Sequence, residues 1–398
     1  MPGNATGCNN FSPCNPLLVL KKIYIISGEA SGDLHAANLI KAMLERDSQL
    51  QFRCWGGDRM QEAGAEIVKH YRDLAFMGFI EVIMNLRTIM GNIKFCKEDI
   101  QTWKPDLVVL VDYPGFNLRI AEFLHQEGIP VHYYISPQIW AWKQNRVYKI
   151  RALVDKMYVI LPFEQDFYKK FDYDVEFVGH PLLDVIEDRK DQGDYKAEFL
   201  KKNGLGTAPI IALLPGSRKQ EISKMLPLML RCMDDFPKHQ FVIGAAPSQE
   251  KEYYQGFLSD KPRATLIDAQ TYELMRYADA GLVTSGTATL EAALWGLPEV
   301  VCYKGSPISY WIARMLIKVK FIGLVNLVMD RLVVTELIQS ELNRKNMVRE
   351  LKALLYDDER KAKLQSDYSE LWSKLGGAGA SGKVADFILQ SLHASNES

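Results

Sequence analysis

Short runs of β-branched and other apolar residues alternate along the chain with longer segments of helical hydrophobic periodicity. This alternation is typical of βα units, which build parallel sheets rather than hairpins. A first set of expected strands comprises Lys22–Ile26, Phe52–Trp55, Leu107–Asp112, Val131–Ile135, Met157–Leu161 and Val175–Val178. A second set comprises Ile210–Leu214, Phe241–Ala245, Ala264–Ile267, Gly281–Thr284 and Val300–Tyr303. We therefore predict an α/β protein with two doubly wound parallel sheets.

A polar, charged run at Asp188–Gly206 separates the two sets of strands and marks the expected domain boundary. The chain has 398 residues, and a single core seldom grows beyond about 250–300 residues. We expect a loose extension over 1–20, a first domain over 21–187 and a second over 207–350. Residues 351–398 show only helical patterns, so we expect them to cross back to the first domain.

The amino-acid composition bears on whether the chain binds nucleic acid, metals or other cofactors. The formal net charge of −1 gives no general attraction to nucleic acid, so no nucleic-acid partner is expected. The six cysteines lack the paired spacing of a disulfide framework or a zinc site. The acidic pair Asp172 and Asp174 precedes a strand, away from the anion-binding strand ends, so we expect no metal and no other cofactor.

Two segments have a mixed apolar and cationic character. Met77–Phe95 and Ser309–Met329 combine long apolar side chains with lysine or arginine, but neither contains 18 uninterrupted apolar residues. They fit either helices packed in a cleft or helices lying on an anionic lipid surface.

Candidate chemistry in the first domain gathers where expected strands end. The loop with Gly28, Glu29, Ser31, Gly32 and Asp33 joins a strand to a helix, as ligand-binding loops of open α/β sheets do. An ordinary loop with Asp33 or Ser31 capping the helix explains it as well. Asp112, followed by Asn117, ends another strand and fits either a general base or a turn-forming residue.

The segment after the next strand contains Trp140, Trp142, Lys143 and Arg146. Two indoles and two cations suit a sugar, an acyl chain or a phosphate, although a solvated basic helix face explains the cations equally well.

In the second domain, Ser217, Arg218 and Glu221 follow the first strand. The guanidinium of Arg218 can hold a diphosphate that leaves during transfer, or it can simply pair with Glu221. Another strand end carries Thr284, Ser285, Gly286 and Thr287 before a helix that contains Glu291. Such a helix start attracts phosphate, and Glu291 is placed for ribose hydroxyls, while plain N-capping is the alternative.

The glycine-rich run Gly377–Lys383 matches nucleotide-binding patterns only superficially. It follows a helical stretch instead of a strand, and Val384 occupies the position of the required Ser or Thr. We predict a turn between two helices there.

Taken in order, SGEASGDLH, FMGFIEV, DYPGFN, SPQIWAWKQNRV, LPFE, VGHP, LLPGSRKQE, SGTATLE and LVNLV resemble the lipid-A-disaccharide synthase family over about residues 22–390. The resemblance implies the GT-B fold, in which two Rossmann-like domains face each other across a cleft. It also implies inverting transfer of 2,3-diacylglucosamine from UDP to 2,3-diacylglucosamine 1-phosphate, giving a β-1,6 disaccharide and UDP. Carried over by motif, the UDP-sugar residues are Ser217, Arg218, Glu221, Thr284, Ser285, Gly286, Thr287, Glu291 and Asn326. The acceptor residues are Gly28, Glu29, Ser31, Gly32, Asp33, Asn117, Trp140 and Arg146, with Asp112 as the base.

This chain departs from the family at one position. Many members have a second carboxylate in DxPDFN, where this chain has Gly115. Asp112 is then the nearest base candidate, and Asp106 is a weaker one. The resemblance further implies peripheral association with the cytoplasmic leaflet of the inner membrane, as a monomer or homodimer. The alternatives are another GT-B enzyme, such as a UDP-N-acetylglucosamine 2-epimerase or a lipid-linked glucosaminyltransferase, and a non-catalytic scaffold that binds nucleotide sugar.

Overall fold

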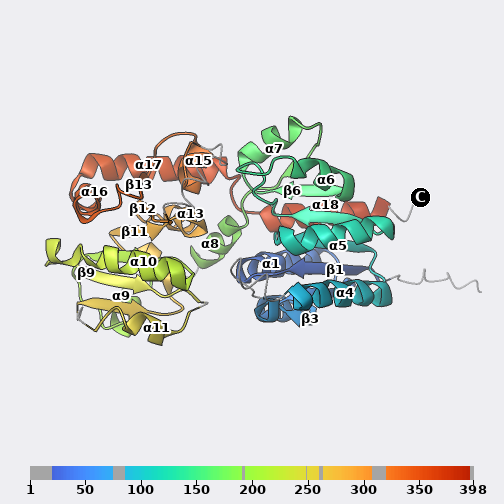
Figure 1. Ribbon diagram of the computed structural model, residues 1–398, viewed down its shortest axis with the longest axis horizontal. Coiled ribbons are helices and arrows are strands. Elements are labelled where there is room, and N and C mark those ends of the chain that lie inside the picture. The colour runs from blue at the N-terminus through green and yellow to red at the C-terminus, as the bar shows by residue number, and fades with distance from the viewer. Residues whose placement is uncertain are drawn as a thin grey trace, which may run out of the picture.

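The computed structural model describes residues 20–74, 86–190, 193–247, 249–259, 263–306 and 320–394. Two parallel sheets lie side by side along the long axis of the molecule, each surrounded by helices (Figure 1). This arrangement confirms the prediction of two Rossmann-like domains.

The first sheet has the strand order β3-β2-β1-β4-β5-β6-β7, and all of its pairings are parallel. Its strands are β1 (Lys22–Ser27), β2 (Gln51–Gly56), β3 (Glu66–His70), β4 (Leu107–Val111), β5 (Val131–Tyr134), β6 (Lys156–Val159) and β7 (Glu176–Phe177). The central strand β4 is buried at every position, as expected for a strand covered on both faces.

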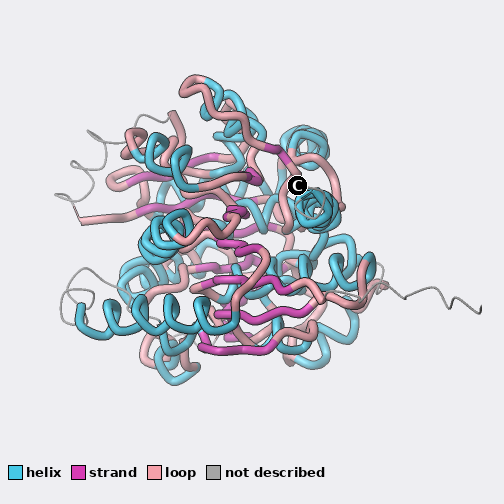
Figure 2. Tube along the Cα trace, turned by 90° about the vertical axis from the view of Figure 1, so that its right-hand side faces the viewer, coloured by secondary structure: helices cyan, strands magenta, loops and turns pink. Residues whose placement is uncertain are grey.

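Helices cover both faces of this sheet, as Figure 2 shows from the side of the first domain. One face packs against α1 (Ala30–Arg46), α2 (Asp58–Glu62) and α18 (Ala380–Ala394). The other packs against α4 (Leu86–Trp103), α5 (Pro114–Gln126), α6 (Arg146–Leu153) and α7 (Pro162–Lys169). A 3₁₀ turn, η1 (Tyr71–Leu74), follows β3.

The second sheet has the order β10-β9-β8-β11-β12-β13 and is also parallel throughout. Its strands are β8 (Ile210–Leu214), β9 (Gln240–Gly244), β10 (Ala264–Ile267), β11 (Ala280–Thr284), β12 (Glu299–Tyr303) and β13 (Thr335–Ile338). Its helical elements are α9 (Lys196–Lys202), α10 (Lys219–Leu230), η2 (Met233–Asp235), α11 (Lys251–Gln255), α12 (Thr271–Tyr277), α13 (Thr287–Leu294), α15 (Leu324–Met329), α16 (Arg344–Tyr356) and α17 (Asp358–Lys374).

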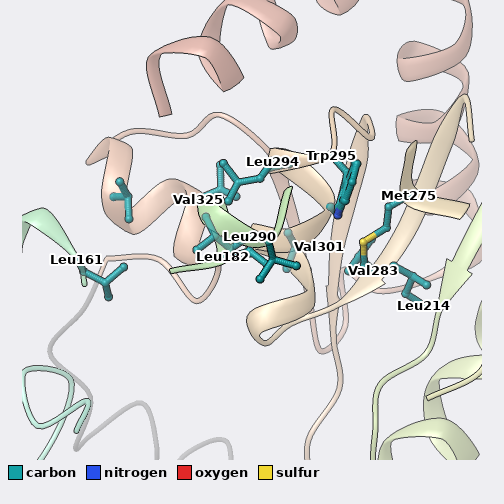
Figure 3. Close-up of a cluster of buried hydrophobic side chains, with 14 of the residues drawn as sticks. Leu161, Leu182, Leu214, Met275, Val283, Leu290, Leu294, Trp295, Val301 and Val325 are labelled. Carbon is teal, nitrogen blue, oxygen red and sulfur yellow. The ribbon is translucent and has the colours of Figure 1, made fainter. Parts of the chain in front are cut away.

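Two segments of the chain connect the domains. Helix α8 (Leu182–Lys190) follows β7 and packs against α13, where Leu182 lies among the core side chains of the second domain (Figure 3). The return path runs from α17 to α18, whose Val384 and Ile388 pack against the first sheet. The two connecting segments contact each other. The Asp184 carboxylate of α8 accepts hydrogen bonds from the Gly379 and Ser381 amides, at 2.6 and 2.9 Å.

The glycine-rich run lies in the turn between α17 and α18, as predicted, with Gly376, Gly377 and Gly379 at positive φ. The chain after Leu342 is helical throughout the described residues, which was also expected.

Two strands were not predicted. Both β3 and β13 lie at sheet edges, where one side of a strand is open. Their sequences EIVKH and TELI carry charges and are only partly buried, so they lack the apolar run on which the prediction relied. The predicted polar boundary also contains the short helix α9.

Candidate functional site

The topology of each sheet creates one crevice at its carboxyl edge. In the first sheet β1 and β4 are neighbours whose connections leave in opposite directions, and in the second sheet β8 and β11 are the corresponding pair. Ligands of open α/β sheets bind at such switch points. The two motif loops of each domain follow these four strands, so the structure brings these loops together at the crevice of their own domain.

The two carboxyl edges face each other. Arg59 of α2, which follows β2, lies close enough to Tyr272 at the start of α12 to lower the pKa of that phenol, although burial has the larger and opposite effect. Because both helices begin at carboxyl edges, the carboxyl edges of the two sheets approach each other at this point.

Asp112 immediately follows β4, at the crevice of the first sheet. Its backbone has a φ of 45°, and the next residue, Tyr113, has a φ of 46°. Burial raises the pKa of the half-buried Asp112 carboxyl, the charge of Glu29 adds to this effect, and together they raise the pKa to about 6. A carboxylate with this pKa is ionised at neutral pH yet basic enough to take a proton from a hydroxyl.

The loop between β1 and α1 lies directly against the Asp112 turn. A Cβ built on Gly28 would lie 2.4 Å from the Tyr113 ring, so only glycine allows this close approach. Glu29 and Ser31 are exposed beside it.

Gly32 and Asp33, which lie in the first turn of α1, have internal contacts instead. The buried Asp33 carboxylate accepts hydrogen bonds from the Gly57, Arg59 and Met60 amides, at 2.7, 3.2 and 3.2 Å. It therefore caps the start of α2, and the expected contact of Asp33 with the acceptor stays a prediction. A Cβ on Gly32 would lie 2.3 Å from the Ser27 hydroxyl, so Gly32 serves close packing of α1.

Asn117 of α5 is fully buried beneath Asp112. Its amide Nδ2 donates to the Val111 carbonyl at 3.2 Å and to the Asp112 carbonyl at 2.7 Å. Asn117 therefore contacts the backbone of the candidate base rather than the open crevice.

The aromatic segment after β5 divides into a buried and an exposed part. The Trp140 indole is buried, and its Nε1 donates to Glu164 Oε1 at 3.1 Å, so it anchors the loop rather than forming an open rim as expected. Trp142 is 45% exposed, and the Lys143 Nζ lies 4.3 Å from its ring centroid. The Arg146 guanidinium lies 6.0 Å from the same ring. The cation and indole surface predicted from the sequence is therefore present, with Trp142 as its aromatic member.

In the second domain, Arg218 occupies the N-cap position of α10. Its side chain is 67% exposed and lies 3.5 Å from the Glu221 carboxylate. Glu221 accepts the Ser217 and Arg218 amides, at 3.2 and 3.4 Å, and so caps the helix through the backbone. The exposed guanidinium therefore has only a weak internal partner and can reach a ligand in the crevice.

The other loop of this crevice joins β11 to α13. Gly286 is the N-cap, Thr287 is exposed at the helix start, and the Ser285 amide donates to the Cys302 carbonyl at 2.9 Å. The buried Thr284 hydroxyl has no hydrogen-bond partner among the described residues. A helix N-terminus with free amides and nearby hydroxyls attracts phosphate oxygens.

Glu291 lies one turn into α13. Burial raises the pKa of its carboxyl to about 7, and a hydrogen bond from Tyr272 opposes this increase. Tyr272 was not predicted, because it belongs to α12 and comes near Glu291 only in the folded chain.

Asn326, which is expected to bind UDP, has internal hydrogen-bond partners. Its Nδ2 donates to the Val334 carbonyl and to Glu336 Oε1, at 2.9 and 2.8 Å. Its Oδ1 accepts the Val333 and Val334 amides, at 2.7 and 3.0 Å. All four hydrogen-bonding positions of the side-chain amide are used, so the side chain has a structural role, and contact of Asn326 with UDP stays a prediction.

Two features are absent from the described part of the chain. No group of three or more His, Cys, Asp or Glu side chains there is arranged to hold a metal ion. None of the helices there is both long and apolar enough to cross a membrane.

These features define the class of the protein as a two-domain α/β protein with the GT-B fold. Solved structures support the fold. The chain resembles a UDP-GlcNAc 2-epimerase from Neisseria meningitidis bound to UDP-GlcNAc, with a TM-score of 0.65 and 15% identity, covering 93% of this chain and 100% of that one. It also resembles the glycotransferase of kitacinnamycin, with a TM-score of 0.64 and 14% identity, covering 94% and 99%.

Sequence comparison identifies the family. The profile of the lipid-A-disaccharide synthetase family matches residues 23–389. A lipid-A-disaccharide synthase of Syntrophus aciditrophicus is 42% identical over 375 residues, covering 93% of this chain and 97% of that protein. The corresponding protein of Myxococcus xanthus is 37% identical, with coverage of 93% and 97%. The chain belongs to the lipid-A-disaccharide synthase family, as its motifs predicted.

Proposed function

We propose that the protein joins UDP-2,3-diacylglucosamine to 2,3-diacylglucosamine 1-phosphate, forming the β-1,6 disaccharide of lipid A and releasing UDP. One observation carries the proposal. A carboxylate with a raised pKa lies at the switch point of one sheet, while an exposed arginine and a helix N-terminus lie at the switch point of the other. Full-length similarity to proteins named lipid-A-disaccharide synthase supports the choice of substrates.

On the donor side, Arg218 and the amino end of α13 hold the diphosphate, and Glu291 holds the ribose hydroxyls. A guanidinium and backbone amides stabilise the negative charge that grows on the diphosphate as its bond to the sugar breaks. This positive potential performs the role that a divalent cation has in other transferases, so the mechanism requires no metal.

On the acceptor side, Asp112 removes the proton from the attacking hydroxyl as that oxygen bonds to the anomeric carbon. Attack from the face opposite the leaving UDP inverts the anomeric configuration. Glu29 and Ser31, which lie beside the Asp112 turn, contact the acceptor, as does the surface formed by Trp142, Lys143 and Arg146.

Both substrates carry acyl chains, so we propose peripheral association with the cytoplasmic leaflet of the inner membrane. Helix α4 supports this because Met90 and Phe95 are 58% and 44% exposed and the Lys94 side chain is 79% exposed. Apolar side chains beside a cation suit an anionic lipid surface. Of the segments Met77–Phe95 and Ser309–Met329, residues 77–85 and 309–319 lie outside the described residues.

The test is mass spectrometry of the product formed by purified protein from a defined UDP-diacylglucosamine and its monosaccharide 1-phosphate acceptor. The expected product is the disaccharide 1-phosphate, with one UDP released per disaccharide. Conversion of the UDP-sugar in the absence of acceptor would instead indicate an epimerase. Binding of UDP-sugar without any new product would indicate a non-catalytic scaffold.

A further inference from the structure

The peptide that carries Asp112 departs sharply from the strand before it. Asp112 and Tyr113 are two consecutive residues with side chains, and both have left-handed backbone conformations. Steric contact of the Cβ with the carbonyl oxygen disfavours this conformation for residues other than glycine. It persists at functional sites when surrounding contacts fix it.

The alternation of side chains explains what this departure achieves. Leu110 packs into the apolar layer beneath α4 and α5, and Val111 packs into the opposite layer beneath α1. If the chain continued as a strand, the Asp112 side chain would point into the same apolar layer as Leu110. The left-handed turn instead places the carboxylate outside that layer, in a half-buried position close enough to Glu29 for its charge to affect the Asp112 carboxyl.

Two buried side chains hold this turn from below. The Tyr133 hydroxyl of β5 donates a hydrogen bond to the Asp112 carbonyl oxygen. Nδ2 of Asn117 donates to the same oxygen at 2.7 Å, and the Asp112 amide donates to the Tyr134 carbonyl at 3.0 Å. Tyr133 and Asn117 are both completely buried, so the donors face no competition from water. The Asp112 peptide is therefore restrained at both its carbonyl and its amide.

We propose that Tyr133 and Asn117 are positioning residues for the general base, which hold the Asp112 peptide in the orientation that directs its carboxylate into the crevice. Neither touches the reacting atoms. The proposal rests on the proposed function, because it assumes that Asp112 takes the proton of the acceptor.

Tyr133→Phe is the primary test, because it removes the donor but keeps the buried ring. We expect kcat to fall about tenfold, the effect of losing roughly one buried hydrogen bond at the reacting geometry. KM for both substrates should stay within about twofold, since neither binding surface includes Tyr133. Tyr134→Phe is the matched control, as the adjacent tyrosine on the opposite face of β5, and its kcat should equal that of the wild type.

A double-mutant cycle separates positioning from general structural damage. In an Asp112→Asn background, adding Tyr133→Phe should lower the residual rate by less than about twofold, because no base remains to be positioned. An equal loss in both backgrounds, or an unchanged kcat for Tyr133→Phe alone, would overturn the proposal. Asn117→Ser provides a second variant at the same carbonyl and should also lower kcat without raising KM.

The activity of the wild type separates failure of the proposed function from failure of the positioning role. If the wild type forms no disaccharide from the defined substrates, the proposed function fails. If the wild type forms it and Tyr133→Phe is as fast, only the positioning role fails.

Discussion

Replacing Arg218 by alanine should remove much of the affinity for UDP while leaving the fold almost equally stable. The side chain is 67% exposed and its contact with Glu221 is 3.5 Å long. An exposed ion pair of this kind contributes about 0.3–0.5 kcal/mol, less when salt screens it. The helix cap survives because Glu221 accepts backbone amides, which alanine also has. The expected loss of stability is therefore below about 0.5 kcal/mol.

The loss of binding should be several times larger. Hydrogen bonds from a guanidinium to phosphate oxygens are charge-assisted and contribute about 1.5–3 kcal/mol. Since about 1.4 kcal/mol corresponds to a factor of ten, UDP should bind about 10–150-fold more weakly. Isothermal titration with UDP measures this change, urea denaturation measures stability, and the kcat/KM for the UDP-sugar should fall in parallel.

Arg263→Ala is the matched control. Arg263 precedes β10 at the amino edge of the same sheet, opposite the crevice, and is another partly exposed arginine, 3.4 Å from Asp234. It should leave UDP affinity unchanged. The reasoning is refuted if Arg218→Ala binds UDP within twofold of the wild type, or if its loss of affinity follows a comparable loss of stability.

Four further predictions concern other parts of the molecule. Because the pKa of Asp112 is raised to about 6, kcat/KM should fall tenfold per pH unit below about pH 6, and Asp112→Asn should lose most activity together with this dependence. Chelation by EDTA should leave the rate unchanged, and restoration by magnesium of a lost activity would contradict the proposed mechanism. Gly115→Asp should raise the free energy of unfolding in urea by about 1 kcal/mol, because a Cβ there meets nothing within 4 Å and an acid suits the first turn of α5. Burial and the charge of Glu336 raise the pKa of Glu299 well above its usual value. Wild-type stability should therefore fall as pH rises above about 4.3, the usual pKa of a glutamate, whereas Glu299→Gln should lose this fall.

The sequence predicted the features that depend on local patterns. Continuous apolar runs located the buried strands, and residues directly after β1, β4, β8 and β11 were correctly expected at carboxyl edges. The charged edge strands β3 and β13 gave no such signal, since their pairing depends on one neighbouring strand.

The roles of individual side chains depended on partners far away in the sequence. Asp33 caps a helix that begins 25 residues later, and the Trp140 indole donates a hydrogen bond to Glu164. Asn326 donates a hydrogen bond to Glu336 of β13, a strand that was not predicted. A sequence motif gives the residue type at a position. It does not show which backbone amide will lie next to that side chain in the folded protein. Tyr133 is the converse case, since nothing in its strand pattern indicates contact with the Asp112 carbonyl.

The return of α18 to the first sheet has a consequence for how the chain reaches its native state. Val384, Ala385, Ile388 and Leu392 complete the apolar layer that also contains Ile23 and Ile25 of β1. During synthesis, the first domain emerges with this layer uncovered and stays so until the second domain has been made. The exposed face is then a site for chaperone binding or aggregation. The first domain therefore cannot complete its folding before the second domain has been synthesised. Cleavage of the chain between α17 and α18 should destabilise the first domain.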